Sequence, residues 1–534
     1  MVRWPDVLII GAYLSGLVGM GLYFSRRQTS TEQYFVARRS IPGWAMGMSL
    51  LATIITSITF IAYPGSAYAD NWSLIVPGFM FVVVLAIAGK VLVPFFRQSV
   101  RMSAYEYFGK RFGRSIRLYS SFAFVLGHFS KMGFVFYLLS LTVSSMTGWK
   151  IGNVLAVAGV VTIFYTLIGG MEAVIWTDVL QGFVLWTGIC VCIGFLLFLP
   201  PGGPHAVLSV AWQNHKFSLG SMELRLDQPT ILVLVIYGFF FYLQKYTADQ
   251  TVVQRYLVAP TDRSALRGIT LGAALCIPVW GAFMLIGSLL WAYYRLTGER
   301  LPPSINKPDQ VFPHFLVTHL PVGFAGLFVA CLFGSAMSML ASDMNALAVI
   351  GVEDYYVLLR PQSSDKSRLR MGRWLVVVSG LGAAGAGWGL VHSHGSALSL
   401  YFAVTASVAG GLAGLFLLAF LCPRACRGAA QAGVAASLLV TAWGLLTSGS
   451  VKIAELGRWD FPWHEYMVGA VGNIVLFCVG LLISLLAPGP HLTDPRLTLW
   501  GWMRKSSEDR ILNIVAQEHI STHGTGSEEM VCID

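Results

Sequence analysis

Residues 334–346, "GSAMSMLASDMNA", place three serines, an aspartate and an asparagine inside the apolar run 322–350. Small and hydroxyl side chains recur there at i, i+3, i+4, i+7 and i+11 and so share one face of a helix: Ser335, Ser338, Met339, Ser342 and Ala346. Such a face suits either close helix packing or oxygen ligands for a small hard cation. Asp343 adds a charge, which makes the run a candidate ion site.

Three more ionisable side chains fall inside apolar runs. Asp178, in "GGMEAVIWTDVLQG", is expected at the start of a helix, where it either serves function or complements the helix N-terminus. Lys131 follows Arg117 by about 20 Å of helix, so it needs an anionic partner, either a solute carboxylate or a protein acid. His128 is expected to be a hydrogen-bonded packing residue.

A further polar group closes the run 230–247. Lys245 and Asp249 are spaced i, i+4, which favours a local ion pair. Gln244 precedes them and is a candidate solute ligand. Lys90 lies close enough to a helix end to extend its ammonium to the interface.

The amino-acid composition indicates whether these helices lie in water or in a lipid bilayer. Of 534 residues, 55% are hydrophobic and 12% charged, and the mean hydropathy is +0.66. A soluble chain could not bury so much apolar surface, so we expect a polytopic all-α membrane protein. The sequence has no P-loop, no HExxH and no second soluble domain, and its cysteines form no expected disulfide framework. An ATP-driven pump, an attached enzyme domain and an enzymatic function are therefore not expected, and no cofactor other than a transported ion is expected.

A helix crosses the bilayer in about 20 apolar residues, which predicts thirteen spans in one membrane domain. The first is expected to be a retained helix and not a signal peptide. The spans are 6–24, 43–62, 75–96, 118–145, 151–170, 176–199, 230–247, 268–295, 322–350, 373–392, 396–421, 430–447 and 465–487.

The loops after spans 1, 3, 7, 9 and 11, together with the tail, carry 24 of the 36 lysines and arginines. Because basic loops stay inside, this bias predicts an N-terminus outside and a cytoplasmic C-terminus. The net charge of +10 follows from this topology, so no nucleic-acid partner is expected. The chain is expected in the cell membrane, with the lipid bilayer and a small solute as its partners and no obligatory protein partner.

Two expected spans are irregular. The second, "MSLLATIITSITFIAYPGSAYADNW", is rich in hydroxyls and holds "YPG", and the seventh, "IYGFFFYLQKYTADQ", is polar at one end. Irregular spans five apart are typical of a five-plus-five inverted repeat. We therefore expect repeats at 43–199 and 230–421, a peripheral helix and loop at 1–42, peripheral helices at 430–487 and a cytoplasmic tail at 488–534.

Several motifs in order resemble the sodium:solute symporter family, and within it the bacterial sodium/sialic acid symporters. They are "YFSRRQTSTEQYFVARRSIPGWAMGMSLLATIITSITF", "SAYEYFGKRF", "GGMEAVIWTDVLQG", "TADQTVVQRYL" and "LPVGFAGL", within residues 5–420. The resemblance implies a LeuT-like fold with thirteen spans and symport driven by a cation, with Na⁺ favoured.

The resemblance also implies ion ligands. One sodium site would use the carbonyls of Ala52 and Ile55 together with Ser335 and Ser338, but Met339 replaces a serine hydroxyl of that site. A second sodium site would join Asp178 to Ser338 and Ser342, but Ala341 replaces a serine there. A thioether is a weak ligand for a hard ion, so both sites have lost an oxygen.

We hypothesise that the carboxylate of Asp343 compensates for these losses, binding either Na⁺ or a proton. The alternative is that Asp343 pairs with a lysine such as Lys245 and only holds the bundle together. The coupling ion is therefore Na⁺, H⁺ or none.

The solute side is also altered. Lys131 stands where the sialic acid branch has an arginine that binds the sugar carboxylate, and it keeps the charge without the bidentate fork. Thr56 and Thr59 match hydroxyls that contact solute, while Gly78 replaces a glutamine and is expected to enlarge the pocket. A small organic anion or acidic sugar such as sialic acid fits these residues. The alternatives are a proton-coupled or uncoupled transporter of another solute, or a solute sensor built on the same fold.

Overall fold

The computed structural model describes residues 4–504 except 27, 304, 306, 322, 393–410, 449–454 and 487–493. Within this part of the chain, every regular element is a helix. Ten helices are long and apolar enough to cross a membrane, and one bent pair forms an eleventh candidate span. The chain is therefore a multi-pass integral membrane protein, as its composition predicts.

The long helices follow the expected spans. They are α1 (Trp4–Ser25), α5 (Val76–Ser99), α7 (Arg114–Thr147), α8 (Ile151–Phe198), α10 (Ile231–Ala248), α12 (Asp262–Thr297), α14 (Phe324–Ile350), α16 (Asp365–Val391), α19 (Arg427–Thr447) and α20 (Met467–Leu486). Shorter helices are α2 (Thr31–Val36), α6 (Tyr105–Phe112), α9 (Gly203–Gln213), α11 (Gln250–Val258), α13 (Val311–His319), α15 (Val357–Leu359) and α18 (Leu412–Leu421), and a π-helical turn (Gly351–Tyr356) extends α14.

Part of the expected eleventh span and most of the expected tail lie outside the described residues. Of the span 396–421, residues 411–421 are described, and of the tail 488–534, residues 494–504.

Helix α8 contains two expected spans. Its 48 residues would extend about 72 Å at 1.5 Å per residue, more than twice the hydrocarbon thickness. At Gly170 the backbone has φ 57° and ψ −159°, a conformation that favours glycine, and the chain turns there. Asp178 lies eight residues after this turn. The sequence-based placement of Asp178 at a helix start is therefore wrong.

Two spans are broken. Helices α3 (Gly43–Ile54) and α4 (Ser57–Ala69) meet at 60° across extended residues Ile55 and Thr56. Helices α10 and α11 are separated by extended Asp249. The "YPG" motif does not make the break, because Pro64 lies inside α4. The irregular second and seventh spans are confirmed, whereas the repeat boundaries stay a prediction.

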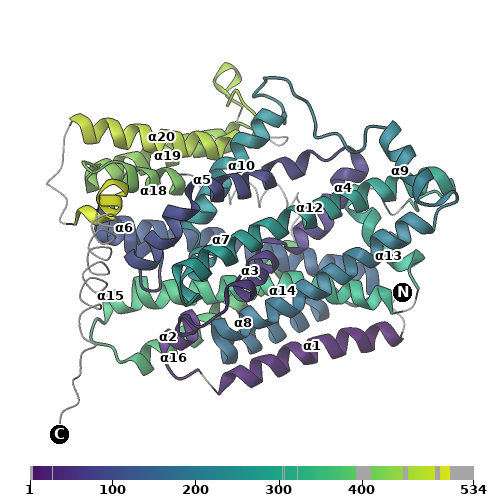
Figure 1. Cartoon of the computed structure of the whole chain (residues 1–534), viewed down its shortest axis with the longest axis horizontal. Coiled ribbons are helices and arrows are strands. Elements are labelled where there is room, and N and C mark those ends of the chain that lie inside the picture. The colour runs from purple at the N-terminus through teal and green to yellow at the C-terminus, as the bar shows by residue number, and fades with distance from the viewer. Residues whose placement is uncertain are drawn as a thin grey trace, which may run out of the picture.

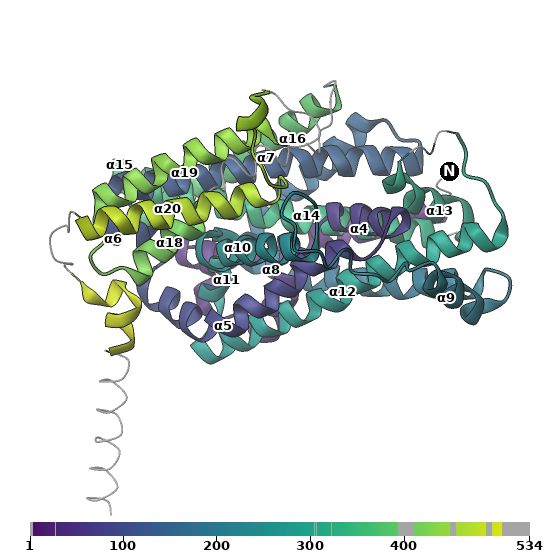
Figure 2. The same cartoon turned by 90° about the horizontal axis from the view of Figure 1, so that it is seen from above.

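Helix α14 lies in the middle of the bundle in both views (Figures 1 and 2), and α1 lies at the lower edge in Figure 1. In the most apolar window of each span, 89% of the residues are buried for the span that begins with α14, against 22% for α1. A helix buried on all sides cannot hide a polar group in water or lipid headgroups, so the charges on α14 must find partners in neighbouring helices.

Close helix contacts hold α3 against α12. A Cβ added to Gly47 would lie 2.6 Å from the carbonyl oxygen of Gly268, and one added to Gly272 would lie 2.7 Å from the carbonyl oxygen of Gly47. Only glycine permits this approach, which allows dispersion contacts between the two backbones. The packing holds the first half of α3 against α12.

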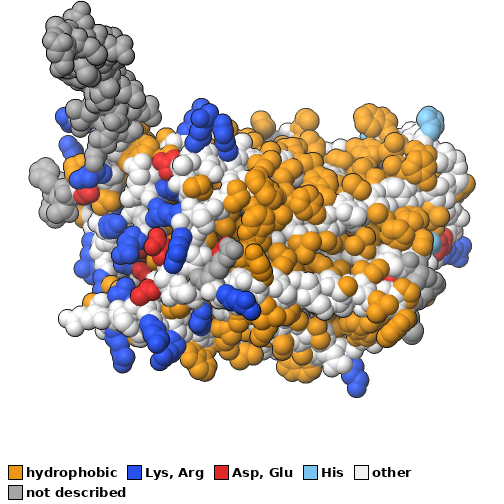
Figure 3. Space-filling view, turned by 60° about the horizontal axis from the view of Figure 1, so that its bottom comes forward, with side chains coloured by type: hydrophobic (Ala, Val, Ile, Leu, Met, Phe, Trp, Pro, Cys, Tyr) orange, Lys and Arg blue, Asp and Glu red, His pale blue; other side chains and the backbone are white. Residues whose placement is uncertain are grey.

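The two ends of the molecule differ in charge. Helix α1 begins at the right of Figure 1, whereas α6, α15 and the segment 494–504 lie at the left. Lysines and arginines gather at that left end, and the visible face beyond them is largely hydrophobic (Figure 3). This separation agrees with the distribution of basic loops in the sequence.

Candidate functional site

A buried carboxylate joins three helices. Asp178 of α8 is fully buried, and its Oδ2 accepts a hydrogen bond of 2.5 Å from the Ser49 hydroxyl of α3. Its Oδ1 accepts a hydrogen bond of 2.5 Å from the Ser338 hydroxyl of α14. The structure thus brings together Asp178 and Ser338, as the resemblance implies.

The counter-ion of this carboxylate is Arg255 of α11. Its side chain is fully buried, and Nη2 lies 3.2 Å from Asp178 Oδ2. The same nitrogen donates to Ser342 Oγ at 2.9 Å and to Thr53 Oγ1, and Nε donates to Ser49 Oγ at 3.2 Å. We call Ser49, Thr53, Asp178, Arg255, Ser338 and Ser342 the Asp178 cluster.

The Asp178 cluster suits a hard cation because its donors are one carboxylate and four hydroxyls. Within the carboxylate, Oδ2 accepts hydrogen bonds from Ser49 and Arg255, whereas Oδ1 accepts one from Ser338. Because each carboxylate oxygen has two lone pairs, Oδ1 retains capacity for a cation. The guanidinium balances the charge from the other side, which makes burial of the carboxylate tolerable.

The expected backbone ligands lie beside this cluster. Ile55 N donates to Leu51 O in the last helical bond of α3, so the carbonyls from Ala52 to Ile55 follow the final intrahelical acceptor. Ala52 and Ile55 are both buried, and α3 packs against α14. Ser335 is buried on α14, and its hydroxyl bonds to Leu332 O of its own helix. These three residues stay candidate ligands.

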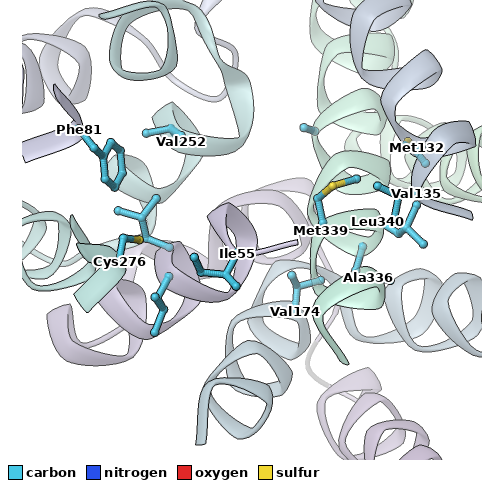
Figure 4. Packing of buried hydrophobic residues seen from close by; sticks show 14 of the residues in the cluster. Ile55, Phe81, Met132, Val135, Val174, Val252, Cys276, Ala336, Met339 and Leu340 are labelled. Atoms are coloured by element: carbon cyan, nitrogen blue, oxygen red, sulfur yellow. The ribbon is translucent and has the colours of Figure 1, made fainter. Parts of the chain in front are cut away.

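Met339 points into apolar surroundings. Figure 4 shows it on α14 near Ala336 and Leu340, with Val135 of α7 and Val174 of α8 on either side. Its side chain is fully buried in the hydrophobic core. The position that carries a serine in the resembling family therefore contributes packing here and no oxygen.

A second charged group surrounds His128 of α7. Its Nδ1 lies 2.8 Å from Asp343 Oδ1, and its Nε2 lies 3.3 Å from Asp249 Oδ2. Lys131 Nζ lies 3.0 Å from Asp343 Oδ2, and Lys245 Nζ lies 2.5 Å from Asp249 Oδ2. We call these five residues the His128 cluster. The expected Lys245–Asp249 ion pair is confirmed.

Asp343 faces α7, and its contacts differ from those hypothesised. Its Oδ1 contacts His128 and Lys131, and its Oδ2 contacts Lys131. Ser338 and Ser342 instead form hydrogen bonds within the Asp178 cluster. Consecutive helix residues project about 100° apart, so Asp343 is turned away from the direction of Ser342 and shares the direction of Met339. The alternative hypothesis, that Asp343 pairs with a lysine, therefore agrees with the structure. The lysine is Lys131, however, and not Lys245.

The remaining solute candidates lie around the two broken spans. Thr56 is half-buried in the break between α3 and α4, and Thr59 is buried one turn later. Gln244 is half-buried on α10, next to Lys245. Gly78 does not enlarge a pocket, because a Cβ added there would lie 2.6 Å from the ring of Trp280. The indole fills the space that the missing side chain leaves.

Sequence reasoning missed Arg255, Ser49 and Thr53. Arg255 was assigned to a cytoplasmic basic loop, but α11 returns it to the bundle interior. The available signal was its place in "TADQTVVQRYL", one of the motifs that carry the resemblance. The bridging position of His128 was missed as well, because its two partners are 121 and 215 residues away.

Comparison with known proteins gives one consistent picture. The model of the sodium:solute symporter family matches residues 34–436. The sodium/sialic acid symporter NanT of Aliivibrio fischeri is 35% identical over 90% of this chain and 92% of its own length. The sodium/sialic acid symporter SiaT of Proteus mirabilis is 30% identical over 91% and 96%.

Solved structures agree with this comparison. A Na⁺-coupled sialic acid symporter in its substrate-bound outward-open state superposes with a TM-score of 0.84 at 30% identity, covering 92% of this chain and 99% of that one. Mhp1, a nucleobase-cation-symport-1 family transporter, superposes with a TM-score of 0.53 at 15% identity, which is a likeness of fold alone.

Proposed function

Because this chain belongs to the sodium:solute symporter family, we propose that it couples inward movement of Na⁺ to uptake of an acidic sugar of the sialic acid type. Membership makes it a transporter and not an enzyme, and gives it the LeuT-like fold that the sequence predicts. The observation that carries the proposal is the Asp178 cluster, in which a buried carboxylate and hydroxyls converge on α14.

The proposed sodium site uses Asp178 Oδ1 with the hydroxyls of Ser338 and Ser342. The carbonyls of Ala52 and Ile55 with Ser335 form the proposed neighbouring site, which is weakened by Met339. Asp343 is not included, because its oxygens are held by His128 and Lys131.

The proposed solute site adjoins the break between α3 and α4. Lys131 would bind the carboxylate of the sugar, and Thr56, Thr59 and Gln244 would bind its hydroxyls or amide. The names of the relatives support this choice of solute, since NanT and SiaT are sodium/sialic acid symporters. We further propose the orientation that the basic end suggests, with the N-terminus outside, the C-terminus inside and the chain in the plasma membrane.

Mechanism follows from where the ligands lie. Na⁺ binding beside Asp178 would fix α3, α8 and α14 relative to one another and stabilise the state open to the outside. The solute would then bind at the broken spans, and movement of the two halves would expose both ligands to the cytoplasm. A gradient of Na⁺ supplies the free energy.

Reconstituted uptake tests the proposal. Proteoliposomes with an inward Na⁺ gradient should accumulate radiolabelled N-acetylneuraminate above its outside concentration, whereas a K⁺ gradient should not drive accumulation. N-acetylmannosamine, which lacks the carboxylate, is the matched solute and should accumulate far less. Accumulation driven equally by K⁺, or equal uptake of the two sugars, would contradict the proposal.

A further inference from the structure

We propose that the His128 cluster binds the carboxylate of the solute together with a proton taken up by His128. The inference rests on the proposed function in one respect, because it assumes that the solute carries a carboxylate. It assigns His128 and Lys245 to solute recognition beside Lys131, and it adds a pH-dependent step to a transporter driven by Na⁺.

The first observation is that His128 has a carboxylate at each ring nitrogen. Nδ1 is 2.8 Å from Asp343 Oδ1 and Nε2 is 3.3 Å from Asp249 Oδ2. A neutral imidazole has one N–H and can donate to one of them, whereas an imidazolium donates to both. The two carboxylates therefore favour the protonated ring.

The second observation is that Lys131 opposes that preference. Its Nζ lies 3.2 Å from Nδ1 of His128. An ammonium donates well to an unprotonated Nδ1 but is repelled by a protonated one. Each protonation state of the ring thus leaves one of its contacts unfavourable, so a further charge beside the cluster can change which state is favoured.

The third observation is the charge balance. Lys131 and Lys245 are balanced by Asp249 and Asp343, so a neutral His128 leaves the cluster without net charge. A protonated His128 leaves one buried positive charge, which is costly without a counter-ion. A carboxylate from the solute supplies that counter-ion. By attracting the ammonium of Lys131, it also weakens the repulsion at Nδ1, so carboxylate and proton bind more tightly together than apart.

Exposure indicates the side from which the anion enters. The side chains of His128, Lys131 and Lys245 are 12%, 14% and 17% exposed, whereas those of Asp249 and Asp343 are 5% and 0% exposed. The accessible side of the cluster is therefore cationic, and the carboxylates lie behind it. An entering anion meets the cations first.

No further titratable group is needed to explain the ring. In the described part of the chain, three charged groups lie within 3.3 Å of a ring nitrogen of His128: Asp343 of α14, Asp249 between α10 and α11, and Lys131 of α7. On the side of Phe124 the ring stacks at 3.8 Å between centroids. Arg255 of α11 lies nearby, but it is paired with Asp178.

The sign of the pH dependence follows from this linkage. At low pH, His128 is already protonated and the carboxylate binds without proton uptake. As the pH rises through the titration of His128, affinity falls by about tenfold per pH unit, and each bound carboxylate brings about one proton.

Calorimetry tests the proposal on the purified full chain. N-acetylneuraminate is titrated in saturating Na⁺ at pH 6.0 and 8.0, each in two buffers of different ionisation enthalpy, which counts the protons taken up. The variants are His128→Gln, His128→Asn and the control His319→Gln, at a histidine of α13 whose Nε2 lies 2.9 Å from Glu299 in the loop after α12. Thermal stabilisation by Na⁺ verifies that each variant is folded.

The wild type and His319→Gln should take up about one proton per sugar acid at pH 8.0 and bind at least about tenfold more tightly at pH 6.0. His128→Gln and His128→Asn should take up none and bind with the weaker affinity at both pH values. Binding by the wild type without proton uptake, or proton uptake retained in both His128 variants, would overturn this inference alone. A wild type that binds no N-acetylneuraminate at either pH would overturn the proposed function and this inference with it.

Discussion

The Asp178 cluster and the His128 cluster use the same central helix in different ways. Ser338 and Ser342 of α14 face Asp178 and Arg255, both fully buried. Asp343, the next residue after Ser342, faces the partly exposed His128 and Lys131 of α7. A rotation of about 100° between consecutive residues thus separates a site of oxygen donors from a site whose accessible side is cationic.

The two clusters also differ in how their charges can rearrange. In the Asp178 cluster each charged group has several hydrogen-bond partners from other helices, so the pair is rigid and costly to break. In the His128 cluster the ring nitrogens face two carboxylates and one ammonium, so the proposed gain of a proton changes which of these contacts are favourable. On the proposals made above, the cation binds at the first cluster and the anion at the second.

The largest effect is expected at Asp178. Asp178→Asn leaves Arg255 buried without its counter-ion, which lowers folding stability by about 3–5 kcal/mol. It also removes the only carboxylate of the proposed sodium site, so uptake of N-acetylneuraminate driven by Na⁺ should fall at least about 100-fold in proteoliposomes with equal amounts of folded protein, which corresponds to about 2.7 kcal/mol or more in ion binding.

The matched control is Asp227→Asn, which removes an exposed ion pair with Arg225. Exposed pairs contribute about 0–1 kcal/mol, so uptake should be unchanged. Wild-type uptake in Asp178→Asn would mean that the Asp178 cluster is a structural pair and takes no part in coupling.

A smaller and more selective effect is expected at Lys131. Lys131→Gln removes the charge that the solute carboxylate would contact, and a hydrogen bond to a charged group contributes about 1.5–3 kcal/mol. The KM for N-acetylneuraminate should rise about 10- to 100-fold, while the apparent affinity for Na⁺ changes little. The proposed division of roles between the two clusters requires that the change at Lys131 affects the sugar and not Na⁺.

Lys90→Gln is the control, because Lys90 is an exposed lysine on another membrane helix. It should leave both affinities at their wild-type values. If Lys131→Gln weakened Na⁺ and sugar equally, the two clusters would be one functional unit and the division of roles would be wrong.

The fold was predictable further than the site. Apolar run length located the spans, because the bilayer imposes it locally, and the weak points of the second and seventh spans were visible in their composition. Gly170 and the break at Ile55 were placed only by the structure. Arg255 could not be assigned, because a short polar helix such as α11 and a cytoplasmic loop have the same composition.

The site shows the same limit. Asp178 and Ser338 were predicted together through the resemblance, and the structure joins them. The partner of Asp343 could not be chosen between two lysines, because its pairing depends on which face of α14 meets α7. The indole of Trp280 fills the space beside Gly78 from 202 positions further along the chain, which no local pattern indicates.

The smallest expected effect comes from Met339. Met339→Ser restores a hydroxyl next to the proposed backbone ligands, so the Na⁺ concentration for half-maximal uptake should fall about 3- to 10-fold, for a gain of about 1 kcal/mol from one hydrogen-bonding oxygen. Met132→Ser, at another buried methionine of the core, should lower stability without improving Na⁺ affinity. An unchanged Na⁺ dependence in Met339→Ser would place the ion away from this position.

The most direct test of the central claim is thermal stabilisation of purified protein by Na⁺, with K⁺ as the reference. A ligand that binds the folded state raises its stability by RT ln(1 + [L]/Kd), so Na⁺ at 100 times its Kd should add about 2.7 kcal/mol. We predict this stabilisation in the wild type and in Lys131→Gln, and a clearly smaller one in Asp178→Asn, where only the weakened neighbouring site can still bind Na⁺. Stabilisation by Na⁺ that keeps its wild-type size in Asp178→Asn would contradict the assignment of the cation to the Asp178 cluster.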